Sequence, residues 1–98
     1  MTLAEATGKV VKLASNNGGK INAKINFKFD EGIIHLDDTV SPTLVSNDEI
    51  ESDCTIKLSI ENFVNMMHGD LNPMMALMSG KMKIDGSKTV AMKLASLF

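Results

Sequence analysis

The amino-acid sequence predicts an α+β fold, with a single twisted sheet of about five strands, mostly antiparallel, and helices packed on one face. Two observations predict the sheet and its helical layer. Residues 20–30 alternate strictly between apolar and polar side chains, as in a strand with one face on a core. Most strand-like segments precede the apolar helical segments instead of alternating with them, which favours α+β over a doubly wound sheet. A length of 98 residues fits one domain, spanning residues 1–98, with one modest core.

The first predicted element is a helix that begins after Thr2. Thr2 and Glu5 have the spacing of a capping box, in which each residue satisfies a backbone N–H of the other. An Asn-Asn-Gly-Gly run at residues 16–19 ends the helix. Its apolar face consists of Leu3, Ala6, Val10, Leu13 and Ala14.

Four strands are predicted next. In the strand at 20–30, the even-numbered lysines and asparagines are expected to face water. A turn leads to a return strand at 33–37, followed by a short edge strand at 43–45 and a fourth strand at 52–58. The core-facing residues of the first strand are Ile21, Ala23, Ile25, Phe27 and Phe29.

The remaining elements are two short helices, a strand and a last helix. Ser59 is placed to cap the first short helix, and Asn72 the second, which ends at Gly80. Residues 74–78 are apolar all round, so we expect that helix to be surrounded by apolar groups. Residues 81–85 alternate as a strand does, and 87–98 form the last helix. Its inward face is expected to consist of Val90, Leu94 and Leu97.

The second half of the chain carries an ordered set of short motifs, namely Asp53-Cys54-Thr55-Ile56, Phe63, Met66 or Met67, Gly69, Asn72-Pro73, Ala76, Gly80-Lys81-Met82-Lys83-Ile84, Gly86 and Ala91-Met92-Lys93-Leu94. With these motifs the chain resembles the sterol carrier protein 2 family. The order and spacing of these pieces make the resemblance specific. It implies a small carrier with an apolar tunnel and no catalytic chemistry, whose ligands are fatty acids, fatty acyl-CoA, phospholipids or sterols.

Methionine is the unusual residue type. Seven of the eight methionines lie between Met66 and Met92. A loosely specified core would explain them, and so would a wall of adaptable side chains around a variable apolar ligand; the resemblance favours the wall. The predicted lipid-binding residues are Phe63, Val64, Met67, Met74, Leu77, Met78, Met82, Val90 and Leu94.

The charge distribution excludes one class of partner and leaves one question open. A net charge of −2 does not suit nucleic-acid binding, which needs a basic surface. The last 28 residues nevertheless carry Lys81, Lys83, Lys88 and Lys93 against Asp85 alone. These lysines form either an ordinary solvated face or a weak anion-facing patch near a lipid entrance. The chain has no arginine, so it has no bidentate clamp for a headgroup.

No catalytic, cofactor or metal motif is visible. His35 and His68 have no partner at metal-ligand spacing, and Cys54 is expected to be a small buried apolar residue. Asp37 and Asp38 are expected to form a turn beside an edge strand. We therefore expect no enzyme activity, no cofactor and no metal.

The function that the sequence predicts is non-enzymatic lipid binding and transfer in the cytoplasm. The start of the chain has no signal-peptide pattern, its end is not a peroxisomal tripeptide, and a single cysteine fits a reducing compartment. Expected partners are a lipid and, transiently, a membrane. The alternative is an accessory interaction domain for a lipid- or quinone-modifying enzyme, with a homodimer or an enzyme as partner.

Overall fold

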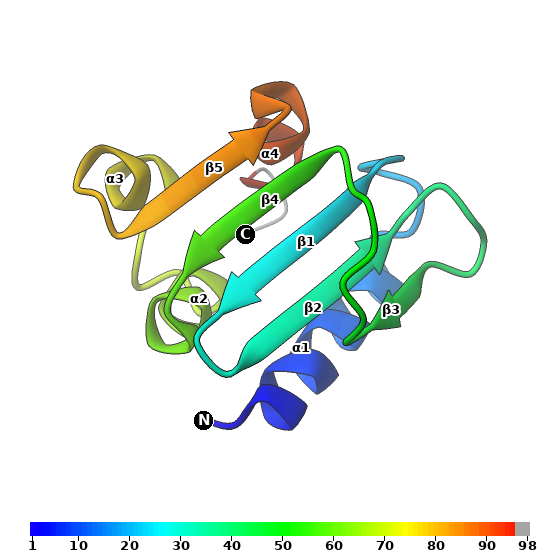
Figure 1. Cartoon of the computed structure of the whole chain (residues 1–98), viewed down its shortest axis with the longest axis horizontal. Helices are drawn as coiled ribbons and strands as arrows, with labels where there is room; N and C mark the ends of the chain where they lie inside the picture. Colours follow the sequence, from blue (N-terminus) through cyan, green and yellow to red (C-terminus); the bar gives the residue numbers. More distant parts are fainter. Residues whose placement is uncertain (96–98) are drawn as a thin grey trace.

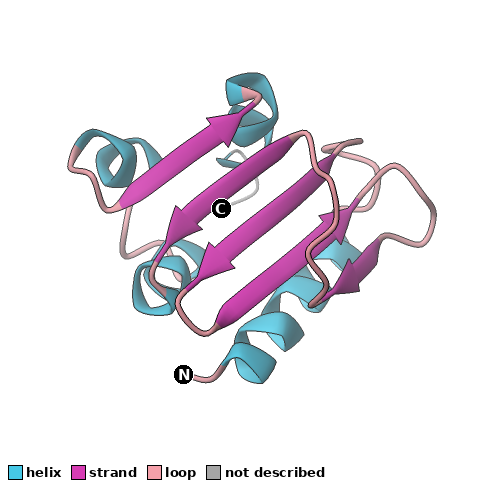
Figure 2. Ribbon diagram, in the orientation of Figure 1, coloured by secondary structure: helices cyan, strands magenta, loops and turns pink. Residues whose placement is uncertain are grey.

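The protein is a single sheet with helices on one side of it. A computed structural model describes residues 1–95. In the view of Figures 1 and 2 the sheet faces the reader, α1, α2 and α4 lie behind it, and α3 lies beside strand β5. The elements are α1 Leu3–Asn16, β1 Lys24–Phe29, β2 Gly32–Asp37, β3 Leu44–Ser46, β4 Cys54–Leu58, α2 Ile60–Met67, α3 Pro73–Met78, β5 Met82–Gly86 and α4 Lys88–Ala95.

The sheet is mixed, which confirms the predicted α+β class. The strand order is β3-β2-β1-β4-β5. Neighbouring strands are antiparallel except for β1 and β4, which are parallel, with Phe27 opposite Ile56. The chain has to pass β2 and β1 to go from the edge strand β3 to β4, and the segment between β3 and β4 makes that crossing over the outer face of the sheet (Figure 1).

Local capping signals define the helix starts as predicted. The Glu5 amide donates to Thr2 Oγ1 at 3.2 Å, and the Thr2 amide donates to the Glu5 carboxylate at 3.2 Å. Ser59 Oγ accepts from the Asn62 amide at 3.1 Å, and Asn72 Oδ1 accepts from the Met74 amide at 2.8 Å. Each cap satisfies a donor that has no partner inside its helix, so these starts are encoded locally.

The first strand is shorter than predicted because Asp38 bends residues 19–22 away from the sheet. The Asp38 carboxylate accepts hydrogen bonds from the amides of Gly19, Ile21 and Asn22, each at 2.9 Å, and from Thr43 Oγ1 at 2.7 Å. Asn22 has a φ of 49°, which a regular strand does not allow. Asp38 therefore holds a buried turn, and ladder pairing begins at Lys24.

The outer face of the sheet is not wholly in water, contrary to the sequence prediction. Asn26 and His35 lie opposite each other on β1 and β2, and both are buried. Asn26 Nδ2 donates to the Ile50 carbonyl at 2.7 Å, which turns Asn26 Oδ1 toward His35 Nδ1 at 2.5 Å. The segment that crosses from β3 to β4 thus covers this part of the face through Ile50.

The junction between β5 and α4 requires glycine. Gly86 has a φ of 96°, and a Cβ at this position would lie 2.6 Å from the Asp53 carbonyl oxygen. Ser87 follows and donates its amide to the same Asp53 oxygen at 2.8 Å. In α4, Ala91 and Leu94 are buried against the sheet. Leu97, which the sequence also placed on this face, lies outside the described residues.

Candidate functional site

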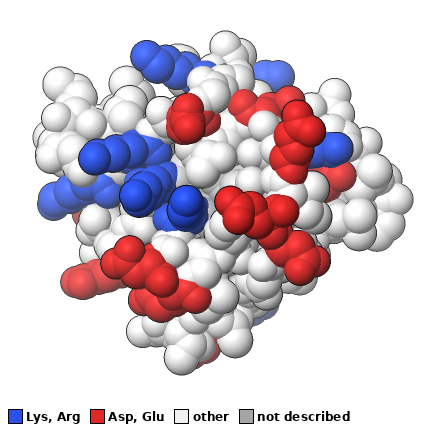
Figure 3. Space-filling view, viewed as in Figure 1, with Lys and Arg blue, Asp and Glu red and all other residues white. Residues whose placement is uncertain are grey.

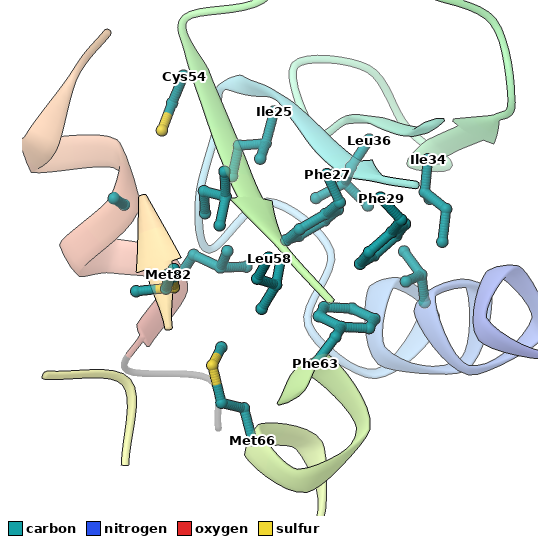
Figure 4. Close-up of a cluster of buried hydrophobic side chains, with 14 of the residues drawn as sticks. Ile25, Phe27, Phe29, Ile34, Leu36, Cys54, Leu58, Phe63, Met66 and Met82 are labelled. Atoms are coloured by element: carbon teal, nitrogen blue, oxygen red, sulfur yellow. The ribbon is translucent and has the colours of Figure 1, made fainter. Parts of the chain in front are cut away.

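Three phenylalanines form the centre of the interior between sheet and helices. Phe63 of α2 packs on Phe27 and Phe29 of β1, with ring centroids 5.0 and 5.3 Å apart and tilted planes. Strand periodicity turns both β1 rings toward the helices, and the i, i+3 pattern of α2 turns Phe63 toward the sheet. Figure 4 shows the three rings together below Ile34 and Leu36. This aromatic cluster fixes α2 on the sheet.

The part of the interior near β5 is lined by flexible side chains. Leu58, Met66 and Met82 are buried there, and in Figure 4 they lie on the side of the aromatic cluster that is nearer to β5. Methionine has an unbranched side chain with a polarizable sulfur, so it refits to irregular apolar shapes at low cost. The interior therefore has a rigid aromatic half and an adaptable half.

The interior is closed. Among the described residues, its enclosed apolar cavity has a volume of about 10 Å³ and lies between α1, α4 and the sheet, with Val10, Phe27 and Leu94 in its lining. Such a volume holds roughly one water molecule, whereas ligand pockets usually enclose about 300–1,000 Å³. The apolar tunnel that the family resemblance implies is thus not open among residues 1–95.

The structure separates the predicted lipid-binding residues into two groups. Six of them face the interior. Phe63, Met82 and Leu94 are buried, and Val64, Met67 and Val90 are half-buried against the same core.

The other three, all on α3, do not face the sheet, so the expectation that apolar groups surround this helix is wrong. Met74 and Leu77 are exposed, and Met78 is 81% exposed. α3 has only six residues and packs beside the edge strand β5, where its small Ala76 is the buried contact. Beside an edge strand, one side of the helix contacts the sheet and the other side stays exposed, although its residues are apolar.

The predicted lipid-binding residues leave out the strand side chains that line the interior and one residue of α2. Phe27, Phe29, Ile56 and Leu58 line the interior, but none of them is among the predicted lipid-binding residues. Met66 of α2, which is 2% exposed, is also missing from that prediction. The alternation along β1 and β4 was a usable signal, because every wall residue on these strands is on their apolar face.

The four lysines near the end of the chain do not form one patch. Lys81 and Lys83 lie at the start of β5, whereas Lys88 and Lys93 belong to α4, which follows the other end of that strand. Lys83 instead lies opposite Lys57 of β4. Strand register, which is not visible in the local sequence, decides these neighbours.

Comparison with known proteins identifies the family. A family model described as the SCP-2 sterol transfer family matches residues 2–98. The chain belongs to this family. It is 38% identical over 55 residues to human sterol carrier protein 2, a match that covers 56% of this chain but only 10% of that protein. The chain therefore matches about a tenth of the length of this curated relative.

Solved structures show the same fold. The sterol carrier protein domain 2 of Helicoverpa armigera superimposes with a TM-score of 0.75 and 26% identity, covering 94% of this chain and 84% of that one. The ubiquinone synthesis protein UbiJ-SCP2 superimposes with a TM-score of 0.62 and 15% identity, covering 91% and 73%. At that identity the second likeness concerns the fold alone. Both comparisons confirm the predicted sheet with helices on one face.

Cys54 and His35 lie on opposite faces of the sheet, Cys54 in the core and His35 beside Asn26. Cys54 is buried, and burial, with Asp85 and Asp53 adding to it, raises the pKa of its thiol, which makes the thiolate scarcer. Burial lowers the pKa of His35, against the opposing effect of Asp37, and so disfavours the charged form of its imidazole. Within residues 1–95, no three His, Cys, Asp or Glu side chains are grouped to hold a metal ion. No helix in that range is long and apolar enough to cross a bilayer.

Proposed function

We propose that this protein binds the apolar tail of a single-chain lipid between its sheet and its helices, with no catalytic activity of its own. The single observation that carries the proposal is the adaptable half of the interior, where Leu58, Met66 and Met82 meet next to a rigid aromatic cluster. Membership of a sterol transfer family supports a lipid ligand. The transfer itself, and a transient contact with membranes, are part of the proposal.

Binding requires the closed interior to open. Each buried methylene contributes about 0.8 kcal/mol, so a sixteen-carbon tail gains on the order of 10 kcal/mol before the costs of ordering and opening. We infer that α4 moves, because the described part of this helix buries only Ala91 and Leu94. It is also joined to β5 through Gly86, whose φ of 96° marks a sharp change of direction. Leu94 lines the 10 Å³ cavity, which would be the point where opening begins.

A flexible chain fits this interior better than a rigid ring system. An acyl chain can enter progressively while methionines change rotamer, whereas a sterol needs most of its volume at once. We therefore infer that fatty acids and acyl esters are preferred to sterols.

Thermal melting of delipidated protein tests the proposal. At a concentration one hundred times the dissociation constant, palmitate should raise the melting temperature by about 10 °C or more. Octanoate at the same molar concentration as palmitate should produce a much smaller shift, because it buries about half as many methylenes and binds more weakly. If palmitate, oleate and palmitoyl-CoA all leave the melting temperature unchanged, the protein is not a carrier of single-chain lipids.

A second candidate function is an accessory domain for a lipid- or quinone-modifying enzyme. The shared fold with a ubiquinone synthesis protein favours it, as does the exposure of Met74, Leu77 and Met78 on α3. Native mass spectrometry of protein purified from cells separates the two functions. A bound lipid supports the carrier, and a stoichiometric protein partner supports the accessory domain.

A further inference from the structure

Three lysines face each other across three neighbouring strands on the outer face of the sheet. Lys28 of β1 lies opposite Lys57 of β4, and Lys57 lies opposite Lys83 of β5. Lys81 precedes Lys83 by two residues and adds a fourth cation beside them. All four side chains are exposed, and Figure 3 shows the resulting blue patch over the ends of β1 and β4 and the start of β5. We call these four residues the lysine ladder.

The ladder is an electrostatic cost that no ion pair within residues 1–95 offsets. Like charges that lie directly opposite each other in a sheet destabilise it. No carboxylate of residues 1–95 forms an ion pair with any of the four lysines. They line an open hollow of about 450 Å³, in which Asp30 is the only acid. The arrangement thus concentrates positive charge around a concave surface.

Exposed apolar side chains border the ladder. α3 packs against β5, which begins at Met82, between the ladder residues Lys81 and Lys83. In Figure 3 the surface at the upper left of the blue patch is uncharged, whereas acidic side chains lie below the patch and to its right. Met75 is 63% exposed and Met78 81% exposed, and Met74 and Leu77 are exposed with them. The helix carries no charged side chain. An apolar helix of this kind next to a cluster of lysines is the composition of an interfacial anchor.

We propose that α3 and the lysine ladder together form a docking surface for a bilayer that contains anionic lipids. The methionines enter the boundary between headgroups and acyl chains, and the lysines meet the lipid phosphates. A bilayer suits these residues because lysines act as separate point charges on flexible stems and need no fixed partner geometry. The inference deepens the proposed function, on which it rests for the reason why the protein meets a membrane. Docking is measured without lipid uptake, so the two proposals can fail separately.

Vesicle partitioning of charge variants tests the ladder. Vesicles of phosphatidylcholine, with and without phosphatidylserine, are incubated with the full chain at low salt and sedimented. The triple variant Lys28→Gln, Lys57→Gln and Lys83→Gln should bind phosphatidylserine vesicles about a hundredfold more weakly, at roughly fivefold for each lysine. The matched triple variant Lys12→Gln, Lys20→Gln and Lys88→Gln makes the same change in net charge on other surfaces and should lose only a few fold. Equal losses in the two triples would overturn the proposal.

Variants of α3 test the apolar part of the surface. Met75→Gln with Met78→Gln should weaken binding at low salt and also remove the residual binding at high salt, where the lysines are screened. Met92→Gln changes a methionine that is 66% exposed on α4 and should have no effect. All these side chains are exposed, so the circular dichroism of each variant should match that of the parent.

Two further measurements distinguish other occupants. Free glycerophosphoserine at the concentration of the vesicle headgroups should not displace the protein, because a single headgroup offers neither acyl chains nor several charges. Displacement would overturn the bilayer proposal in favour of a headgroup pocket. Sedimentation equilibrium should show the same mass for the parent and the Met75/Met78 variant, and a dimer lost in the variant would assign the surface to a second copy of the chain.

Discussion

Phe63 lies against Phe27 with ring centroids 5.0 Å apart and planes inclined at 49°, and this contact joins helix α2 to the parallel strand pair at the centre of the sheet. Both rings are almost completely buried. The same contact fills the space in which a lipid tail would lie. Stability of the lipid-free protein and capacity for lipid therefore oppose each other at this point.

Shortening Phe63 should separate these two properties. Phe63→Leu leaves a void beside Phe27 and Phe29 and should lower the free energy of unfolding of the lipid-free protein by about 1–2 kcal/mol. Palmitate should then raise the melting temperature of the variant more than that of the parent, since less of the interior has to be displaced. An equal or smaller shift in the variant would place the lipid elsewhere.

A charge in the adaptable half of the interior should abolish lipid binding. Met82 is buried on β5, and Met82→Lys would put an ammonium group in an apolar site at a cost of several kcal/mol. Met82→Leu nearly conserves the volume and should bind palmitate as the parent does. Met92→Lys introduces the same charge at an exposed position and is the control. Affinities come from calorimetric titration of delipidated protein, and normal affinity in a folded Met82→Lys variant would contradict the assignment of Met82.

Asp38 should make folding sensitive to acid. Its burial raises the pKa of the carboxyl group, but the hydrogen bonds from Gly19, Asn22, Thr43 and Ile21 outweigh this effect and hold the pKa below its ordinary value. A carboxyl with a depressed folded-state pKa contributes stability above its unfolded pKa of about 3.9, and this contribution is lost as the pH falls through the folded pKa. Asp38→Asn leaves amide donors unpaired and should cost about 2 kcal/mol at pH 7.

Urea unfolding of the parent and of Asp38→Asn over a range of pH provides the measurement. The difference in unfolding free energy between the two proteins should be full at neutral pH and should shrink as the pH falls below about 4. A difference that is independent of pH would mean that the charge of Asp38 contributes nothing.

The lysine ladder should cost stability. Lys57 has a lysine opposite it on both neighbouring strands, so Lys57→Gln removes two like-charge contacts and should stabilise the fold by about 0.5 kcal/mol at low salt. The gain should fade at high salt, because exposed charges are screened. Lys12→Gln on α1 is the control and should be neutral. If Lys57→Gln destabilises the fold, the packing of the aliphatic stem of Lys57 contributes more to stability than its charge takes away.

The features that the sequence predicted well are those that neighbouring residues decide. Thr2, Ser59 and Asn72 cap helices because each meets backbone donors two or three residues away. The alternation along β1 identified its buried face because a strand inverts its side chains at every residue. The predicted site residues Phe63, Val64 and Met67 face the core for the analogous reason, because their spacing along α2 selects one face.

The features that the sequence did not predict depend on distant partners. Residues 74–78 are apolar all round, so their pattern selects no face, and only the position of α3 beside an edge strand leaves Met78 exposed. The juxtaposition of Lys28, Lys57 and Lys83 depends on the register of a parallel and an antiparallel pair. The burial of His35 depends on a segment that crosses the outer face between β3 and β4. Each of these three features can be predicted only when the tertiary structure is known.

Methyl NMR with ¹³C-labelled methionine tests the central claim most directly, because the chain carries methionines both inside and outside. Met66 and Met82 are buried in the proposed site, whereas Met92 is exposed on α4. On addition of palmitate to delipidated protein, the methyl groups of Met66 and Met82 should shift and show nuclear Overhauser effects to the acyl methylenes, and the methyl group of Met92 should show no such Overhauser effect. Effects confined to the exposed methionines of α3, or none at all with saturating palmitate, would contradict a lipid site between the sheet and the helices.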